Sequence, residues 1–261
     1  MSLDEPALLR RDEDGIAWLT LNRPAQRNAL SSALLLALEG QIDAIARDRK
    51  VKVVVIAGNG VGFCAGHDLR EMRANPGRQA YEAVFAHSSR LMIALTRLPQ
   101  VVIARVHGIA AAAGCQLVAS CDLVVASTAA RFAVNGINIG LFCATPMVAL
   151  TRAVGRKAAM EMLMTGDLVE AERAKAIGLV NRVVPPEQLD AEVTALARQI
   201  AQKLTLAVVV GKEAFYRQAE LGLEAAYAYT TEVMAKNMAA RDTEEGIDAF
   251  LEKRQPRWPC D

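Results

Sequence analysis

His107-Gly-Ile-Ala-Ala-Ala-Ala-Gly-Cys-Gln-Leu-Val-Ala-Ser-Cys-Asp122 is the stretch that decides the fold of this chain of 261 residues. The β-branched run at residues 101–106 precedes it and predicts a buried strand. Because glycine and alanine carry almost no side chain, the backbone that follows can approach a ligand closely. A helix that begins there directs free N–H groups at an oxygen that becomes negative during a reaction. The alternative is that the tract only packs a helix against a sheet.

A second stretch has the same design. Residues 51–57 (Val-Lys-Val-Val-Val-Ile-Ala) predict another buried strand, and the glycines at 58, 60 and 62 predict the turn that ends it. Asp68 is suited to cap a new helix. Two strand–glycine–helix corners, each supplying one backbone N–H to a single carbonyl oxygen, would form an oxyanion hole.

Four segments of the chain together resemble the crotonase (enoyl-CoA hydratase/isomerase) family. They are residues 27–30 (Arg-Asn-Ala-Leu), 63–69 (Phe-Cys-Ala-Gly-His-Asp-Leu), 107–122 and 176–185 (Ala-Ile-Gly-Leu-Val-Asn-Arg-Val-Val-Pro). Residues 115–122 and 138–143 (Asn-Ile-Gly-Leu-Phe-Cys) are similar to the enoyl-CoA hydratase domain-containing subgroup, which lacks the family's usual pair of glutamates.

Strands that alternate with helices before a helical tail indicate an α/β fold. Composition also permits a doubly wound sheet, whereas the resemblance implies a spiral of ββα units with a C-terminal helical trimerisation region. We expect one continuous domain with an acyl-CoA-binding core at 1–190 and a helical subdomain at 191–261. The expected strands are 16–21, 51–57, 101–106, 121–126, 131–134 and 180–184. The expected helices are 31 or 32 to 48, 79–97, one from Thr145-Pro146, and most of 186–253.

Composition restricts the class of protein. A net charge of +1 argues against nucleic acid or an anionic membrane as a partner. Arg105 and His107 interrupt the longest apolar stretch, and the acidic N-terminal residues 1–5 do not resemble a signal peptide. Five cysteines without a metal-binding spacing indicate a reducing compartment, so we expect a cytoplasmic protein, or a mitochondrial-matrix one if a transit peptide has been removed.

The resemblance implies that the thioester of an acyl-CoA is held by the backbone N–H groups of His67 and Ala113, so that an enolate can form. It implies a lyase or isomerase of fatty acid metabolism, a trimer or a dimer of trimers, and no metal or cofactor beyond the coenzyme A moiety of the substrate. The family more often has glycine at position 113. Alanine is tolerable there only if its backbone is helical.

The proton-transfer groups depart from the family's pattern. Hydratases of the family use two glutamates, and their positions are Gln116 and Gly136 here. Neither residue can act as a base. An aspartate used by other members falls at about Ala144, and Asn138 is among the polar candidates that remain. Three interpretations stay open: an enzyme with non-standard proton transfer, a decarboxylase of malonyl-type thioesters, and an acyl-CoA binder or scaffold without catalysis.

The resemblance also implies residues that bind coenzyme A. The side chain of His67 either faces the ligand or packs elsewhere, and Gln116 either contacts the ligand or is satisfied by backbone. We expect His107 to hydrogen-bond to a loop, and Cys64 and Cys115 to be packing residues rather than nucleophiles. The residues matched to coenzyme A binding are Arg23, Arg27, Ala65, Asp68, Phe250 and Lys253.

Overall fold

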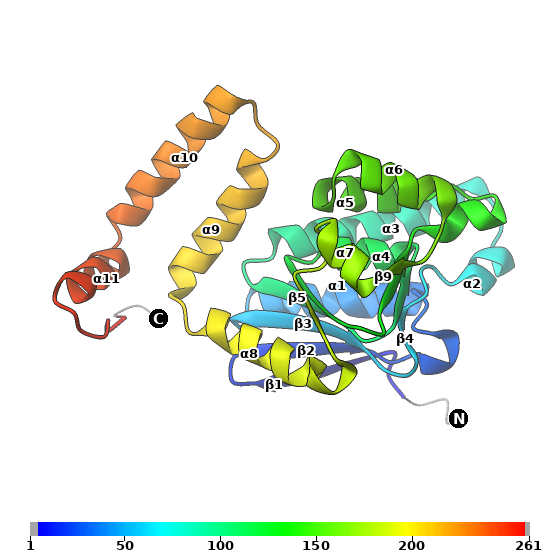
Figure 1. Ribbon diagram of the computed structural model, residues 1–261, viewed down its shortest axis with the longest axis horizontal. Coiled ribbons are helices and arrows are strands. Elements are labelled where there is room, and N and C mark those ends of the chain that lie inside the picture. The colour runs from blue at the N-terminus through cyan, green and yellow to red at the C-terminus, as the bar shows by residue number, and fades with distance from the viewer. Residues whose placement is uncertain (1–4, 259–261) are drawn as a thin grey trace.

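Two β-sheets form the centre of the computed structural model, which describes residues 5–258 (Figure 1). The larger sheet has six strands in the order β1-β2-β3-β5-β7-β10, and only β1 runs antiparallel to its neighbour. The residues of its central strands are buried on both faces, as is typical of parallel sheets, whereas the two edge strands are partly exposed. The strands are β1 (Leu8–Glu13), β2 (Ile16–Leu21), β3 (Val53–Gly58), β5 (Val101–Val106), β7 (Leu123–Ser127) and β10 (Arg182–Val184).

The smaller sheet gives the fold its spiral character. Each of β3, β5 and β7 is followed by a short strand of the smaller sheet and then by a helix, so a ββα unit repeats three times. The expected crotonase-like α/β fold is therefore confirmed. The short strands are β4 (Gly62–Cys64), β6 (Ile109–Ala111) and β8 (Arg131–Ala133), with β9 (Val169–Glu170) antiparallel at the edge.

Helices cover both faces of the large sheet because successive side chains of a strand point to opposite sides. In β2, Ile16 packs with α8 (Leu189–Ala201), while Leu19 and Leu21 belong to the cluster that contains α1 (Ser32–Ala46) and α3 (Arg78–Arg97). The remaining core helices are α2 (Leu69–Ala74), α4 (Ala113–Ser120), α5 (Ala144–Ala153), α6 (Arg156–Thr165) and α7 (Ala171–Ala176), with 3₁₀ turns at Pro24–Gln26, Asn135–Ile139 and Pro186–Gln188.

Three C-terminal helices form an arm that stands away from the sheets: α9 (Thr205–Gln218), α10 (Leu223–Met238) and α11 (Arg241–Leu251) (Figure 1). The arm is tied to the core at Lys212, whose ammonium donates to the carbonyl oxygens of Leu95 and Gln100 and to the Asp122 carboxylate. The division after residue 190 stays a prediction. The packing places α8 on the large sheet, so the helices that leave the core begin at α9.

Most of the expected elements are present. The helix starting at Ser31 or Ser32 begins at Ser32, with the Ser31 hydroxyl accepting from the N–H of Leu34. The prediction that Thr145-Pro146 starts a helix is off by one residue, because α5 begins at Ala144 without a side-chain cap. The sequence patterns missed β1, β4, β6 and β9, which are exposed or very short. Within residues 5–258, no single helix is long and apolar enough to cross a membrane.

Candidate functional site

The two predicted corners lie at the same edge of the smaller sheet. β4 and β6 are parallel neighbours, and the chain leaves them at Cys64 and Ala111. Neighbouring strands are about 4.8 Å apart, so the residues after both carboxyl ends are brought together. A methyl group placed on Gly66 would lie 3.3 Å from the backbone nitrogen of Ala113. The structure therefore brings the first corner (residues 64–68) and the second corner (residues 111–116) into contact.

A glycine turns the chain in the first corner. Gly66 has φ +97°, which L side chains rarely adopt. Leu30 pairs with this segment as an isolated parallel bridge: its N–H donates to the Gly66 carbonyl oxygen, and its own carbonyl accepts from the N–H of Asp68. Neither bond uses the N–H of His67, and no described residue accepts a hydrogen bond from it. The His67 amide thus remains available to a ligand.

An alanine turns the chain in the second corner. Ala112 has φ +48° and ψ −116°, and its N–H donates to the Ala133 carbonyl oxygen at 2.9 Å. Ala113 is the first residue of α4, so its backbone is helical, as the alanine at this position required. The first N–H groups of a helix have no partner within the helix. No described residue accepts from the Ala113 N–H.

Close backbone packing joins the two corners. A Cβ on Gly114 would lie 2.2 Å from the carbonyl oxygen of Cys64, so only glycine permits this approach. Cys64 and Cys115 are fully buried, and burial raises the pKa of each thiol to about 12. Their predicted role as packing residues is confirmed. Cys260 lies outside the described residues.

Asn28 is a structural residue whose role the sequence did not reveal. Its side chain is fully buried and donates to the carbonyl oxygens of Asn59, Gly62 and Phe63 at 2.9–3.0 Å. Its amide oxygen accepts from the N–H of Arg23 at 2.9 Å. Asn28 therefore clamps the first ligand loop to the strand that leads into the first corner. The only available signal was the Arg-Asn-Ala-Leu match, which assigns no role to the asparagine.

Two of the residues matched to coenzyme A binding are paired with each other. The Arg23 guanidinium lies 2.9 Å from the Asp68 carboxylate and also donates to the Ala29 carbonyl oxygen. Asp68 caps α2 by accepting from the N–H groups of Arg70 and Glu71, which confirms its predicted capping role. Desolvation opposes ionisation of Asp68, but these hydrogen bonds and the Arg23 charge outweigh it and lower the pKa of its carboxyl.

Arg27 differs from Arg23 because its side chain is exposed and has no partner among the described residues. Arg27 also has a left-handed backbone, with φ +49°, and its carbonyl oxygen accepts from the N–H of Ala65 at 3.0 Å. The first loop is therefore joined to the segment before Gly66, and Arg27 remains the free cation beside it.

The His67 imidazole is enclosed without a polar partner. Both ring nitrogens are buried and no described residue hydrogen-bonds to them. The ring meets Phe85 of α3 edge to face, with centroids 5.4 Å apart. Burial lowers the pKa of the imidazole from 6.5 to about 4, so the ring is neutral at physiological pH. His107, by contrast, bonds to the Gly60 carbonyl oxygen at 2.9 Å, as predicted.

The positions of the usual glutamate pair hold neutral or absent side chains. Gln116 lies in the first turn of α4, is only 4 % exposed, and has a buried amide oxygen with no described partner. A Cβ on Gly136 would lie 2.3 Å from the Leu141 carbonyl oxygen and 2.8 Å from the Cys143 sulfur. The loop that follows thus occupies the space of a side chain at 136. The Asn138 amide donates to the Gly166 carbonyl oxygen at 3.3 Å, so it ties this loop to the end of α6.

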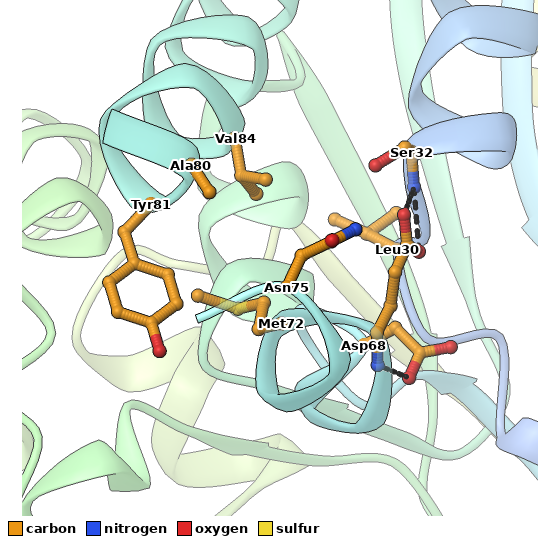
Figure 2. Close-up of a pocket in the computed structure, with 9 residues that line it drawn as sticks. Leu30, Ser32, Asp68, Met72, Asn75, Ala80, Tyr81 and Val84 are labelled. Atoms are coloured by element: carbon orange, nitrogen blue, oxygen red, sulfur yellow. Dashed lines mark hydrogen bonds between the residues drawn. The ribbon is translucent and has the colours of Figure 1, made fainter. Parts of the chain in front are cut away.

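A cavity of about 200 Å³ opens beside the first corner, between α2 and the start of α3 (Figure 2). Leu30, which pairs with His67, and Val84, which precedes Phe85, form part of its wall. Its lining is mainly apolar, with a few polar side chains. The other lining residues are Ser32, Asp68, Glu71, Met72, Asn75, Ala80 and Tyr81.

Phe250 and Lys253 are not brought to the corners of their own chain. Phe250 belongs to α11, which lies at the far end of the arm from β4 (Figure 1), and its side chain is 80 % exposed. Lys253 follows the helix and is exposed. The arm separates both from the core because α9 leads outward after the Lys212 anchor.

Comparison with known proteins identifies the family. The enoyl-CoA hydratase/isomerase family model matches residues 11–260. Rat mitochondrial enoyl-CoA hydratase domain-containing protein 3 is 45% identical over 97% of this chain and 85% of its own. The crystal structure of an enoyl-CoA hydratase from Mycobacterium smegmatis is 58% identical, with a TM-score of 0.95 over 97% of this chain and 99% of that one.

Two further relatives represent the subgroup and the wider family. The crystal structure of the human enoyl-CoA hydratase domain-containing protein 3 is 45% identical, with a TM-score of 0.94 over 97% of this chain and all of that chain. The 2,3-dehydroadipyl-CoA hydratase of Escherichia coli is 37% identical over 92% of this chain and 94% of its own. The motif resemblance is thereby confirmed, and the chain belongs to the enoyl-CoA hydratase/isomerase family.

Proposed function

We propose that this protein binds an acyl-CoA thioester and stabilises its enolate with the backbone N–H groups of His67 and Ala113. The observation that carries the proposal is the contact of two separate corners, each with a turn of positive φ, at Gly66 and Ala112. Both amides lack partners among the described residues. Each donor of such a pair contributes about 3 kcal/mol to stabilisation of a developing oxyanion.

The same geometry argues against ordinary hydration. Gln116 is neutral, and the Leu141 carbonyl and Cys143 sulfur fill the space that a glutamate at 136 would need. Restoring the carboxylates by Gln116→Glu and Gly136→Glu would therefore require the loop at 136–143 to move. We expect crotonyl-CoA hydration to be slow. Loss of carbon dioxide from a malonyl-type thioester generates the enolate without a base, so it remains the alternative reaction.

Coenzyme A would lie along the first loop, where Arg27 is the cation that is not already paired. We assign Arg23 and Asp68 to positioning, because they neutralise each other and hold α2. Ala65 would line the coenzyme A binding site beside Arg23 and Asp68. Gln116 would face the acyl group, and Asn138 is a loop anchor rather than a reacting group.

A second copy would complete the site. The arm exposes large apolar side chains on α10 and α11, and Phe250 and Lys253 lie too far from their own corners to act there. We infer that the arm packs on another subunit, in a trimer or a dimer of trimers. We infer a reducing compartment from the four free cysteines of the described residues. The rat relative is named mitochondrial, which fits the mitochondrial alternative rather than the cytoplasmic one.

The decisive experiment measures polarisation of a bound thioester. A cinnamoyl-CoA analogue absorbs at longer wavelength when its carbonyl accepts strong hydrogen bonds, so we expect a red shift on binding. Gly66→Ala should abolish the shift, because the new methyl would lie 3.0 Å from the Ala112 methyl and 3.3 Å from the Ala113 nitrogen at a φ of +97°.

Gly40→Ala is the matched control, because a Cβ at Gly40 meets nothing within 4 Å. It should leave the shift unchanged. Binding without any red shift in the unmodified protein would contradict the oxyanion hole. Product analysis with enoyl-, hydroxyacyl- and malonyl-CoA then separates an enzyme from a scaffold, since a scaffold binds these thioesters and converts none.

A further inference from the structure

We propose that the imidazole of His67, in addition to its backbone N–H, reads the acyl chain by hydrogen-bonding to an uncharged hydroxyl group near the thioester. This inference rests on the proposed function, because it places the thioester carbonyl at the two corners. It makes His67 a specificity-determining residue through its side chain.

The first argument is the absence of partners for a buried polar ring. Both nitrogens of His67 are buried and unbonded within residues 5–258. A buried polar group without a hydrogen bond normally destabilises a protein, and such groups call for an explanation. Half-buried His107 uses one ring nitrogen to bond to Gly60, and only its other nitrogen is buried and unbonded. Of the three histidines, all within residues 5–258, His67 alone has both ring nitrogens buried and unbonded, and it lies at the corner where a ligand is expected.

The second argument is position. The ring and the proposed donor N–H belong to one residue, so the ring can reach only the first few acyl atoms beyond the thioester carbonyl. Two residues that line the apolar cavity adjoin the His67 ring or its neighbour: Leu30 pairs with His67, and Val84 precedes Phe85. The cavity shown in Figure 2 is lined by these neighbours of the ring and not by His67 itself. To reach the ring nitrogens, an acyl chain in the cavity must displace wall side chains, and Met72 is the most adaptable of these.

The third argument is charge. A neutral imidazole has one donor and one acceptor, which matches a hydroxyl group. A carboxylate would require a cation, but Arg23 is already paired with Asp68 and with the Ala29 carbonyl oxygen, and we assign exposed Arg27 to coenzyme A. Burial lowers the pKa of the imidazole to about 4, so the ring itself does not supply the charge. An alcohol is therefore the better match than an acid.

The test compares the affinities of butyryl-CoA and 3-hydroxybutyryl-CoA by calorimetry. We expect the unmodified protein to prefer the hydroxylated ligand by about fivefold, the contribution of one neutral hydrogen bond. His67→Phe keeps an aromatic ring against Phe85 but has no nitrogen. The readout is the ratio of the two affinities within one protein, and His67→Phe should reduce that ratio to less than twofold.

Ser88→Ala is the matched control, because the Ser88 hydroxyl is also buried and unbonded but lies on α3, one turn beyond Phe85. It should retain the full preference. Equal affinities in the unmodified protein, or an unchanged preference in His67→Phe, would overturn the inference. Failure of both ligands to bind would instead overturn the proposed function on which it rests.

A second measurement does not depend on the variant's folding. The ring nitrogens of His67, observed by ¹⁵N NMR in the unmodified protein, should shift when 3-hydroxybutyryl-CoA replaces butyryl-CoA. Identical ring shifts with the two ligands would overturn the inference even if His67→Phe did not fold.

Discussion

The first corner is held by polar side chains, whereas the second is held by close backbone packing. Asn28, Arg23 and Asp68 form eight hydrogen bonds or ion-pair contacts around the first. In the second corner, Gly114 packs against the Cys64 carbonyl group, and residues 113–118 are all buried. The two N–H groups that we propose to bind one oxygen are therefore held by different means, and the two corners should fail in different ways.

Asn28→Ala should produce the largest loss, because it removes the polar clamp of the first corner. The buried carbonyl oxygens of Gly62 and Phe63, the part-buried one of Asn59 and the Arg23 N–H would lose their partner, which predicts destabilisation by about 4 kcal/mol. Urea unfolding followed by circular dichroism measures it. The control is Asn59→Ala, whose exposed amide bonds only to Asn22 and should contribute less than about 0.5 kcal/mol. Equal losses in both variants would show that Asn28 is not a clamp.

Gly114→Ala should disrupt the second corner by steric overlap alone, because it removes no hydrogen bond. The new methyl would lie 2.2 Å from the Cys64 carbonyl oxygen, so α4 must move away from β4. We expect a loss of about 3 kcal/mol, the upper part of the range for overpacked sites. The red shift of the cinnamoyl probe should disappear together with the stability. Retention of both in a folded variant would mean that the corners tolerate separation.

Acid should lower the free energy of unfolding through His67 of the first corner. The pKa of His67 is about 4 in the folded protein and 6.5 when unfolded, so between these values only the unfolded chain binds the proton. Stability from this group is present above pH 6.5 and is lost as the pH falls towards 4. The loss between pH 7 and pH 5 is about 2 kcal/mol.

The measurement is the difference in pH dependence between the unmodified protein and His67→Phe. Other groups titrate alike in both proteins, so the unfolding free energy of the variant should fall less steeply between pH 7 and pH 5. Parallel curves would show that the imidazole is not shielded from protonation by the fold.

The sequence predicted the long strands before both corners and the cap of α2 because their signals are local. β-branched runs indicated β3 and β5, glycines indicated the turn after β3, and Asp68 indicated a cap. The short strands β4 and β6 and the positive φ of Ala112 gave no such signal. The clamp by Asn28 was not predictable, since its partners lie 31–35 residues away and depend on the folded sheet. The filled space at Gly136 was hidden for the same reason, because Leu141 and Cys143 reach it only when the loop folds back.

The sequence also could not predict that both ring nitrogens of His67 lack a hydrogen-bond partner among the described residues. Whether its ring faces a ligand or packs elsewhere depends on Phe85, which comes from a different helix. Phe250, for which we propose a contact with another subunit, could not be placed from the pattern of one chain.

Ala112→Gly should give the smallest effect and the opposite sign. Ala112 has φ +48° and ψ −116°, a conformation that costs an L residue about 1–3 kcal/mol, whereas glycine adopts it freely. Part of the gain is offset by the larger conformational entropy of glycine in the unfolded chain, so we expect stabilisation by about 1 kcal/mol. Thermal unfolding measures it, with Ala133→Gly as the control at a buried alanine in β8 that should be destabilised. If Ala112→Gly destabilised the protein instead, the alanine methyl would be contributing packing that outweighs the strain, and the second corner would depend on its side chains as well as on its backbone.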